Sequence, residues 1–230
     1  MVRSEGGQGS AVLLSGGLDS AVLLAEVARR ETGRLLVPIY VSVGLAWERE
    51  EVAMIERLLG ASPFRDVQPI ETLSFDMRDV YPPTHWAIRG EPPGFDTPDD
   101  DVYLDGRNIV LLAKAAVFMA RARLSRVYIG PLAGNPFPDA TPEFFETMGR
   151  ALSLGLGTSI EVVAPFATLQ KADVIKLGRS LGVPLELTLS CMQPVRGLHC
   201  GRCSKCRERW DAFRDAGVED PTRYAMAPKR

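Results

Sequence analysis

A glycine-rich turn lies between the first apolar run of the chain and the helix expected to follow it. The apolar run covers residues 11–14, and the turn reads Ser15, Gly16, Gly17, Leu18, Asp19, Ser20. Paired glycines let the main chain bend sharply and approach a phosphate, and the unpaired N–H groups of a helix start attract an anion. The string is neither a Walker A loop nor Gly-x-Gly-x-x-Gly. It predicts a phosphate-binding turn, with a plain strand–turn–helix connection as the alternative.

The four cysteines of the chain lie together near its end. They are spaced C-x8-C-x2-C-x2-C, at Cys191, Cys200, Cys203 and Cys206. Such spacing lets four thiolates converge on one tetrahedral ion, and the apolar core of a signal peptide is missing from residues 1–10, which disfavours disulfides. We predict a structural zinc site, because four protein ligands leave no open catalytic position. An iron–sulfur cluster and unligated buried cysteines are the alternatives. His199 is expected to be a bystander rather than a surplus ligand.

The composition limits the class of protein. The 230 residues are 46% hydrophobic and 24% charged, with 27 basic against 29 acidic side chains. This balance excludes intrinsic disorder and argues against a nucleic-acid partner, which requires clustered excess lysine and arginine. No apolar run is long enough to cross a membrane. We expect a globular, cytoplasmic protein.

Apolar segments with strand and helix periodicity alternate along the chain. Strands are expected at residues 11–14, 35–43, 67–70, 126–130 and 160–163, and helices at 19–30, 49–59, 108–123, 143–156, 171–181 and 206–216. This alternation is typical of parallel βαβ units. The predicted fold class is therefore α/β, with a doubly wound, mostly parallel sheet. The ends, residues 1–9 and 225–230, are expected to fray.

Residues 74–105 interrupt the alternation. They contain five prolines and the run Asp99-Asp100-Asp101, which favours a solvated acidic loop over a metal site. A structureless stretch of this length is often a lid or a binding loop. We therefore divide the chain into an α/β domain at residues 10–185, which contains this insert, and a cysteine segment at residues 186–224.

The glycine turn resembles the PP-loop of the ATP-pyrophosphatase (adenine nucleotide α-hydrolase) superfamily, whose members cleave ATP between its α and β phosphates. Together, the turn and the cysteine segment resemble the 7-cyano-7-deazaguanine synthase family of queuosine biosynthesis. Gly106-Arg107-Asn108 is similar to that family's Pro-Gly-Arg-Asn, and Pro138-Asp139 with Pro142-Glu143-Phe144 to its Tyr-Pro-Asp and Glu-Phe strings. Residues 203–222 resemble its C-terminal end. The resemblance covers residues 11–222.

Some positions depart from the family's pattern. Residues 43–48, from Val43 to Glu48, stand where the family has a Tyr-Gly-Gln-like string, and Asp105 replaces a proline. Phe137 and Ala140 replace a tyrosine and a cysteine. These positions are expected to lie near the substrate, so they bear on which acid is used.

The resemblance implies a ligase that uses ATP, Mg²⁺ and one structural Zn²⁺ per chain. A carboxylate of 7-carboxy-7-deazaguanine attacks the α-phosphate of ATP, and ammonia displaces AMP to give an amide. A second ATP activates the amide oxygen, and loss of AMP leaves the nitrile. Positioning, Mg²⁺ and cationic groups are expected to dominate this chemistry. Family members are often dimers, although no pattern here indicates a homodimer interface.

The resemblance also suggests roles for single residues. Residues 15–20 would hold pyrophosphate, and Asp19 would cap the helix or position Mg²⁺. Arg107 would bind phosphate or carboxylate, or only a helix end or Asp105. The weaker substrate candidates, each with an ordinary structural alternative, are Asn108, Asp139, Glu143 and Lys171. His85 and Trp86 would stack on a base or only pack the loop.

Three other functions compete with nitrile synthesis. A PP-loop amide ligase would adenylate a different carboxylate, and a transferase or amide-forming relative would stop before the nitrile. A non-catalytic nucleotide-binding subunit is disfavoured by the complete glycine turn. Release of AMP and pyrophosphate separates the enzymes from the binding subunit.

Overall fold

A single parallel sheet forms the centre of the protein in a computed structural model, which describes residues 9–228. The strand order is β3-β2-β1-β4-β5, and every neighbouring pair is parallel. The strands are β1 Gly9–Leu13, β2 Leu35–Ser42, β3 Glu71–Ser74, β4 Leu124–Tyr128 and β5 Glu161–Val163. All of β1 is buried, as its unbroken apolar run predicts. The chain leaves β1 in one direction and later returns to its other side at β4, which creates a crevice at the carboxyl end of β1.

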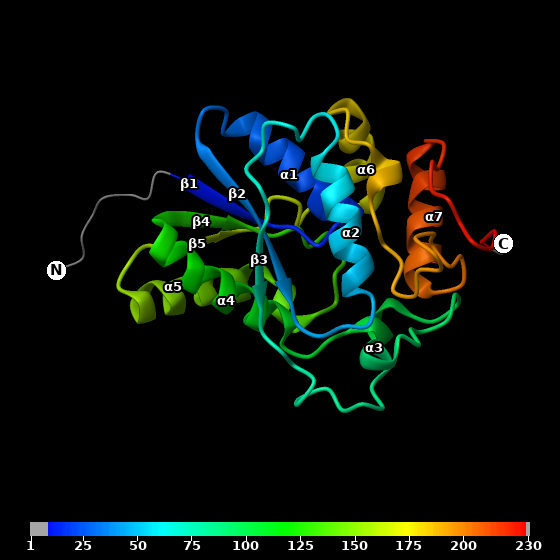
Figure 1. The fold of residues 1–230 in the computed structure, drawn as a ribbon, viewed down its shortest axis with the longest axis horizontal. Helices are drawn as coiled ribbons and strands as arrows, with labels where there is room; N and C mark the ends of the chain where they lie inside the picture. The colour runs from blue at the N-terminus through cyan, green and yellow to red at the C-terminus, as the bar shows by residue number, and fades with distance from the viewer. Residues whose placement is uncertain (1–8, 229–230) are drawn as a thin grey trace.

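Helices cover both faces of this sheet (Figure 1). Alternate residues of β1 point to opposite faces: Ala11 and Leu13 pack in the core that includes α4 and α5, whereas Val12 packs in the core that includes α1, α2 and α6. The helices are α1 Leu18–Arg30, α2 Glu48–Leu59, α3 Trp86–Arg89, α4 Arg107–Ala122, α5 Pro142–Leu156, α6 Lys171–Ser180 and α7 Ser204–Ala216. The doubly wound α/β prediction is confirmed.

The insert at residues 74–105 contains α3 and a short 3-10 turn, Asp99–Val102, and it is tied to its surroundings. Trp86 stacks on Trp47, which lies outside the insert, with ring centroids 5.8 Å apart. Within the insert, Tyr81 donates a 2.8 Å hydrogen bond to the carbonyl of Asp105. Gly94 forms a bridge with Cys203. The insert therefore packs against the residue that precedes α2 and against the cysteine segment, and α3 lies near the start of α2 in the lower part of Figure 1. Loop packing thus accounts for Trp86.

The helix α7 belongs to the same core as the sheet. Its Ala212 and Phe213 lie in the hydrophobic cluster of α1 and α6. Arg209 is fully buried and donates hydrogen bonds to the hydroxyls of Thr188, Ser190 and Thr222 and to the carbonyl of Leu185. Burial of this charge is offset by these four hydrogen bonds, which engage all three guanidinium nitrogens. The division of the chain at residues 185 and 186 stays a prediction.

Three sequence expectations need correction. Residues 67–70 are irregular, because Val67 and Ile70 pack on the α1 cluster instead of pairing, and the third strand begins at Glu71. The fourth strand begins at Leu124. The ends are also more ordered than expected, since Gly9 pairs in β1 and the N–H of Ala225 donates to the carbonyl of His199 at 2.7 Å. Residues 1–8 and 229–230 lie outside the described residues.

No helix among residues 9–228 has the length and hydropathy needed to cross a membrane.

Candidate nucleotide site and cysteine cluster

The glycine turn connects β1 to α1 at the crevice in the sheet. Gly16 adopts φ +74°, and a Cβ there would lie 3.2 Å from the carbonyl oxygen of Glu51. Only glycine combines that backbone conformation with this close approach. Gly17 precedes α1, and no side chain caps the helix start. The turn therefore presents main-chain N–H groups of the kind that bind an anion.

Two hydroxyl groups stabilise the turn from inside. The Oγ atoms of Ser15 and Ser20 lie 3.3 Å apart, and the Ser20 hydroxyl donates to the carbonyl of Gly17 at 3.1 Å. Leu18 is buried in the α1 core. The predicted string thus divides into two serines and two glycines at the turn, a buried leucine, and Asp19 at the pocket.

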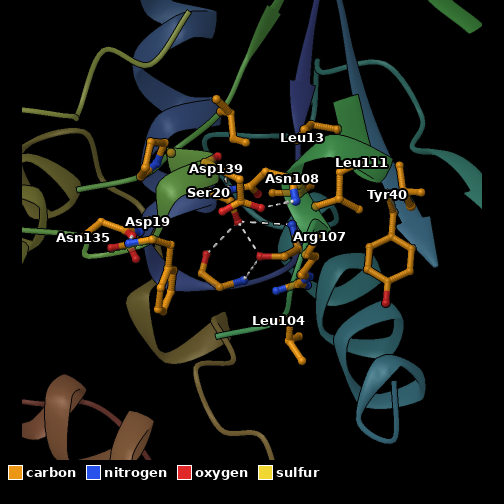
Figure 2. Close-up of a pocket in the computed structure, with 18 of the residues that line it drawn as sticks. Leu13, Asp19, Ser20, Tyr40, Leu104, Arg107, Asn108, Leu111, Asn135 and Asp139 are labelled. Carbon is orange, nitrogen blue, oxygen red and sulfur yellow. Dashed lines mark hydrogen bonds between the residues drawn. The ribbon is translucent and has the colours of Figure 1, made fainter. Parts of the chain in front are cut away.

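A pocket of about 260 Å³ opens at this turn (Figure 2). Ser15, Gly17, Asp19 and Ser20 form one part of its wall. Further wall residues come from α4 and from the chain before α5, including the sequence candidates Arg107, Asn108 and Asp139. The structure therefore brings most of the predicted site residues around one cavity. Its place, at the carboxyl ends of parallel strands where their order reverses, is where ligands bind in open α/β sheets.

Asp19 pairs with Lys171 from the start of α6. Lys171 Nζ lies 2.6 Å from Asp19 Oδ2 and 2.9 Å from Glu208 Oε1, and Glu208 also pairs with Lys205. Burial alone lowers the pKa of Lys171, but the charges of Asp19 and Glu208 outweigh it and raise this pKa above its usual value. Lys171 is therefore a charged, largely buried partner of Asp19 and not an ordinary surface lysine, but it lies outside the residues that line the pocket. Asp19 Oδ1 is buried and has no hydrogen-bond partner among the described residues.

Arg107 and Asn108 begin α4 beside the pocket. The N–H of Asn108 donates to Asp139 Oδ2 at 2.9 Å, and its side-chain amide donates to the Asp139 carbonyl at the same distance. Asp139 is buried, which raises the pKa of its carboxyl group. Arg107 lines the pocket, and its buried Nε has no partner within residues 9–228. Asp139 thus fixes the start of α4, while the Nε–H of Arg107 has no acceptor among the described residues.

Glu143 lies elsewhere. It is exposed in the first turn of α5, outside the residues that line the pocket, and Thr141 caps that helix. Among the positions that depart from the family pattern, Phe137 lines the pocket, where it stacks on Tyr103 with ring centroids 4.8 Å apart. Residues 43–48, Asp105 and Ala140 lie outside the lining.

The sequence patterns did not indicate that Glu51 is a buried acid behind the pocket. Glu51 Oε2 accepts a 2.8 Å hydrogen bond from Tyr40, a pocket residue, and Oε1 accepts one from Trp47 at 3.1 Å. Burial raises the pKa of Glu51 to about 7, although the charge of Arg107 opposes this shift. The sequence does hold one sign of this burial. Glu51 precedes Ile55 and Leu58 at the spacing of the apolar face of α2, which places it on the buried side of that helix.

The four cysteines converge on one point. Cys203 Sγ lies 3.5 Å from Cys206 Sγ and 4.0 Å from Cys191 Sγ, and Cys200 Sγ lies 3.9 Å from Cys206 Sγ. A tetrahedral ion about 2.3 Å from each sulfur places the sulfurs about 3.8 Å apart, which matches these separations. The main-chain N–H of Cys200 donates to Cys191 Sγ. The four buried thiols fit a single metal ion.

His199 is adjacent to this cluster but turned to other partners. Its Nε2 accepts a hydrogen bond from the N–H of Ser190 at 3.1 Å, and its ring packs edge-on against Tyr224. Because its Nε2 is engaged and the group of possible metal ligands consists of the four cysteines, the structure agrees with the expectation that His199 is a bystander.

The doubly wound parallel sheet and the Ser-Gly-Gly-Leu-Asp-Ser turn at its first strand–helix junction define an α/β protein of the PP-loop type. The family model described as "Queuosine biosynthesis protein QueC" matches residues 9–217. The chain therefore belongs to the QueC family.

Relatives with a known name match this chain along nearly their whole length. A protein named 7-cyano-7-deazaguanine synthase from Methanothrix thermoacetophila is 36% identical over 92% of this chain and 96% of its own. One of the same name from Anaeromyxobacter dehalogenans is 34% identical over 93% and 94%.

Among solved structures, the U34-tRNA thiolase NcsA from Methanococcus maripaludis has a TM-score of 0.51 at 12% identity, over 92% of this chain and 68% of that one. A predicted tRNA methyltransferase subunit from Methanocaldococcus jannaschii has a TM-score of 0.50 at 13% identity, over 97% and 98%. These two structures share the fold.

Proposed function

We propose that this protein converts 7-carboxy-7-deazaguanine and ammonia into 7-cyano-7-deazaguanine, with ATP cleaved to AMP and pyrophosphate. The observation that carries this proposal is the sequence similarity, along nearly the whole chain, to relatives named 7-cyano-7-deazaguanine synthase. The pocket beside the glycine turn supports it, because it combines anion-binding main chain with a cation, Arg107, and an aromatic wall at Tyr103 and Phe137.

The proposed reaction needs two rounds of adenylation. In the first, a carboxylate oxygen of the acid attacks the α-phosphorus of ATP and pyrophosphate leaves; ammonia then displaces AMP and gives the amide. In the second, the amide oxygen attacks another ATP, and loss of AMP and a proton gives the nitrile. The glycine turn would hold the β and γ phosphates, while Arg107 would neutralise the acid or the α-phosphate.

Asp19 is the proposed Mg²⁺ ligand. Its buried Oδ1 has no hydrogen-bond partner among the described residues, and Asp19 lies in the pocket wall beside the turn, where it would offer a carboxylate oxygen to a hard cation. Mg²⁺ would supply charge neutralisation for the departing pyrophosphate. For the cysteine cluster we propose one Zn²⁺, because four sulfur ligands at tetrahedral separations leave no position open.

The wider setting follows from the same proposal. The proposed substrates are small molecules, so the reaction would need no nucleic-acid partner. The protein would act in the cytoplasm, as a monomer or a homodimer. The α/β domain at residues 10–185 would carry the chemistry. The segment at residues 186–224 would carry the zinc.

A second candidate is an amide ligase or deazaguanine transferase that uses another acid. The feature in its favour is Phe137, which lines the pocket where the family pattern has a tyrosine, so one hydroxyl donor is missing from the wall. A binding site that hydrogen-bonds its substrate rejects analogues that lack the matching polar group. The loss of one hydroxyl donor from the wall therefore changes which acid the site accepts.

The acid dependence of AMP release tests both candidates. The protein is incubated with ATP and Mg²⁺, with and without 7-carboxy-7-deazaguanine, and with a panel of other heteroaromatic carboxylates. AMP and pyrophosphate that appear with 7-carboxy-7-deazaguanine support the proposal. Release only with a different acid favours the second candidate, and no release with any acid contradicts an adenylating enzyme.

A further inference from the structure

The charged residues behind the glycine turn come from three separate parts of the chain. Asp19 is at the start of α1, Lys171 at the start of α6, and Glu208 in the first half of α7. Lys171 Nζ connects the two carboxylates, at 2.6 Å to Asp19 and 2.9 Å to Glu208. The side chains of Lys171 and Glu208 are only 17% and 23% exposed, so this bridge is largely shielded from solvent. Shielded pairs are screened less than surface pairs.

We propose that Glu208 is a positioning residue for the pyrophosphate site, because it holds the Lys171 ammonium group against Asp19 at the glycine turn. This inference rests on the proposed ATP site. An ammonium group has three N–H donors. Among the described residues, Asp19 and Glu208 accept two of them, which leaves the third N–H to donate to a phosphate oxygen bound at the turn.

The cysteine cluster determines where Glu208 lies. Cys203 is the residue before α7, and Cys206 is in its first turn, so a metal bound by the cysteines fixes the start of the helix that carries Glu208. The next residue, Arg209, anchors the same turn with its buried hydrogen bonds. Glu208 is therefore held on both sides, by a ligand residue before it and by an anchored arginine after it.

A second contact joins the same segment to the turn. The N–H of Leu189, shortly before Cys191, donates a 2.8 Å hydrogen bond to the carbonyl of Gly16. The cysteine segment thus contacts the glycine turn through main chain at Gly16 and through charge at Asp19. This double connection gives the cysteine cluster a part in shaping the phosphate site.

A purely electrostatic role and a positioning role of Glu208 predict opposite effects of its substitution on anion binding. Removal of a carboxylate near an anion site strengthens anion binding if only electrostatics matter. If Glu208 positions Lys171, its loss instead releases the ammonium group from its place against Asp19, and anion binding weakens. Glu208→Met removes both charge and acceptor, whereas Glu208→Gln removes the charge but keeps an acceptor oxygen. Positioning therefore predicts weak binding for Glu208→Met and recovery for Glu208→Gln.

Calorimetric binding of Mg²⁺-pyrophosphate to the metal-loaded protein is the test. Glu208→Met is expected to raise Kd about tenfold, and Glu208→Gln to restore most of the affinity. Asp211→Asn is the matched control, because it removes a carboxylate from the same helix whose ion pair is with Arg214 at the surface; its Kd should not change. Glu208→Asp keeps the charge but shortens the side chain, and a severalfold loss is expected even if Glu208→Met fails to fold.

The double variant with Lys171→Met separates positioning from general destabilisation. Once Lys171 is absent, Glu208→Met should have no further effect on Kd. Unchanged or tighter binding by both Glu208→Met and Glu208→Asp overturns the proposal, as does an equal loss with Lys171 removed. Failure of the unsubstituted protein to bind Mg²⁺-pyrophosphate overturns the ATP site itself, whereas binding that is insensitive to Glu208 overturns this inference alone.

Discussion

The hydroxyl of Tyr40 donates a 2.8 Å hydrogen bond to Oε2 of the buried Glu51 carboxyl group. Tyr40 lines the pocket, and in Figure 2 its hydroxyl is turned from the centre of the site toward α2. Trp47 donates to the other oxygen of the same carboxyl and stacks on Trp86 of the insert. One buried acid therefore joins the pocket wall to the insert.

Glu51 should make stability depend on pH. Burial raises its pKa to about 7 from the usual value of 4.5, so between these values the folded protein binds a proton that the unfolded chain has lost. Its contribution to stability is thus largest at low pH, falls as pH rises through this window, and is constant above it. Between pH 4 and pH 8, Glu51→Gln should gain on the order of 3 kcal/mol in free energy of unfolding relative to the unsubstituted protein.

Urea unfolding at both pH values measures this difference. Glu56→Gln is the control, because Glu56 is exposed on the same helix, and its difference from the parent should not vary with pH. If Glu51→Gln and the parent respond to pH in parallel, Glu51 does not titrate in this window.

Gly16 should be irreplaceable for activity. Gly16→Ala adds a Cβ at φ +74° that meets Ile55 at 3.1 Å and the Glu51 carbonyl at 3.2 Å, so the turn must move. We expect AMP release to fall at least about a hundredfold, because small misplacement of a phosphate site is costly. Gly33→Ala is the control, since Gly33 has φ +81° with nothing within 4 Å of its added Cβ. Equal activity in the two variants would show that the turn does not hold phosphate.

Arg107 should act through its guanidinium shape as well as its charge. Arg107→Met is expected to lower kcat/KM for the acid about a hundredfold, and Arg107→Lys to recover only a small part, because lysine lacks the planar fork. Arg121→Met, an exposed position on the same helix, should leave kcat/KM unchanged. Steady-state AMP release gives these values, and full recovery by lysine would reduce the role of Arg107 to a point charge.

Cys203→Ser should remove about one metal ion per chain and lower the melting temperature, because structural zinc contributes on the order of 10 kcal/mol to folding. Elemental analysis of the purified protein measures the content and distinguishes zinc from iron. His199→Gln should keep the metal, because His199 already accepts a hydrogen bond from Ser190. Unchanged metal content in Cys203→Ser, or its loss in His199→Gln, contradicts the assigned ligand set.

Local patterns predicted the parts of the site that lie on contiguous residues. The apolar run before Ser15, the two glycines and the spacing of the cysteines each carry their own physical reason, so the turn and the cluster followed from the sequence. The alternation of strands and helices also predicted the parallel, doubly wound sheet. The third strand was misplaced because Val67 and Ile70 are apolar for packing on a helix face rather than for strand pairing.

Contacts between distant residues did not follow from any local pattern. Lys171 meets Asp19 across 152 positions of sequence, and only the packing of α6 beside α1 brings them together. Glu208 and Glu51 resemble ordinary helix acids until neighbouring elements cover them. The structure placed Lys171, Asn108 and Asp139 at or beside the pocket and left Glu143 outside it, but the roles of these residues stay predictions.

Product analysis tests the central claim most directly. The protein is incubated with 7-carboxy-7-deazaguanine, ATP, Mg²⁺ and ¹⁵N-ammonium, and the products are followed by mass spectrometry together with AMP. The account predicts 7-cyano-7-deazaguanine that carries ¹⁵N, with two AMP formed for each nitrile. An amide as the final product, or a nitrile without AMP, would contradict it.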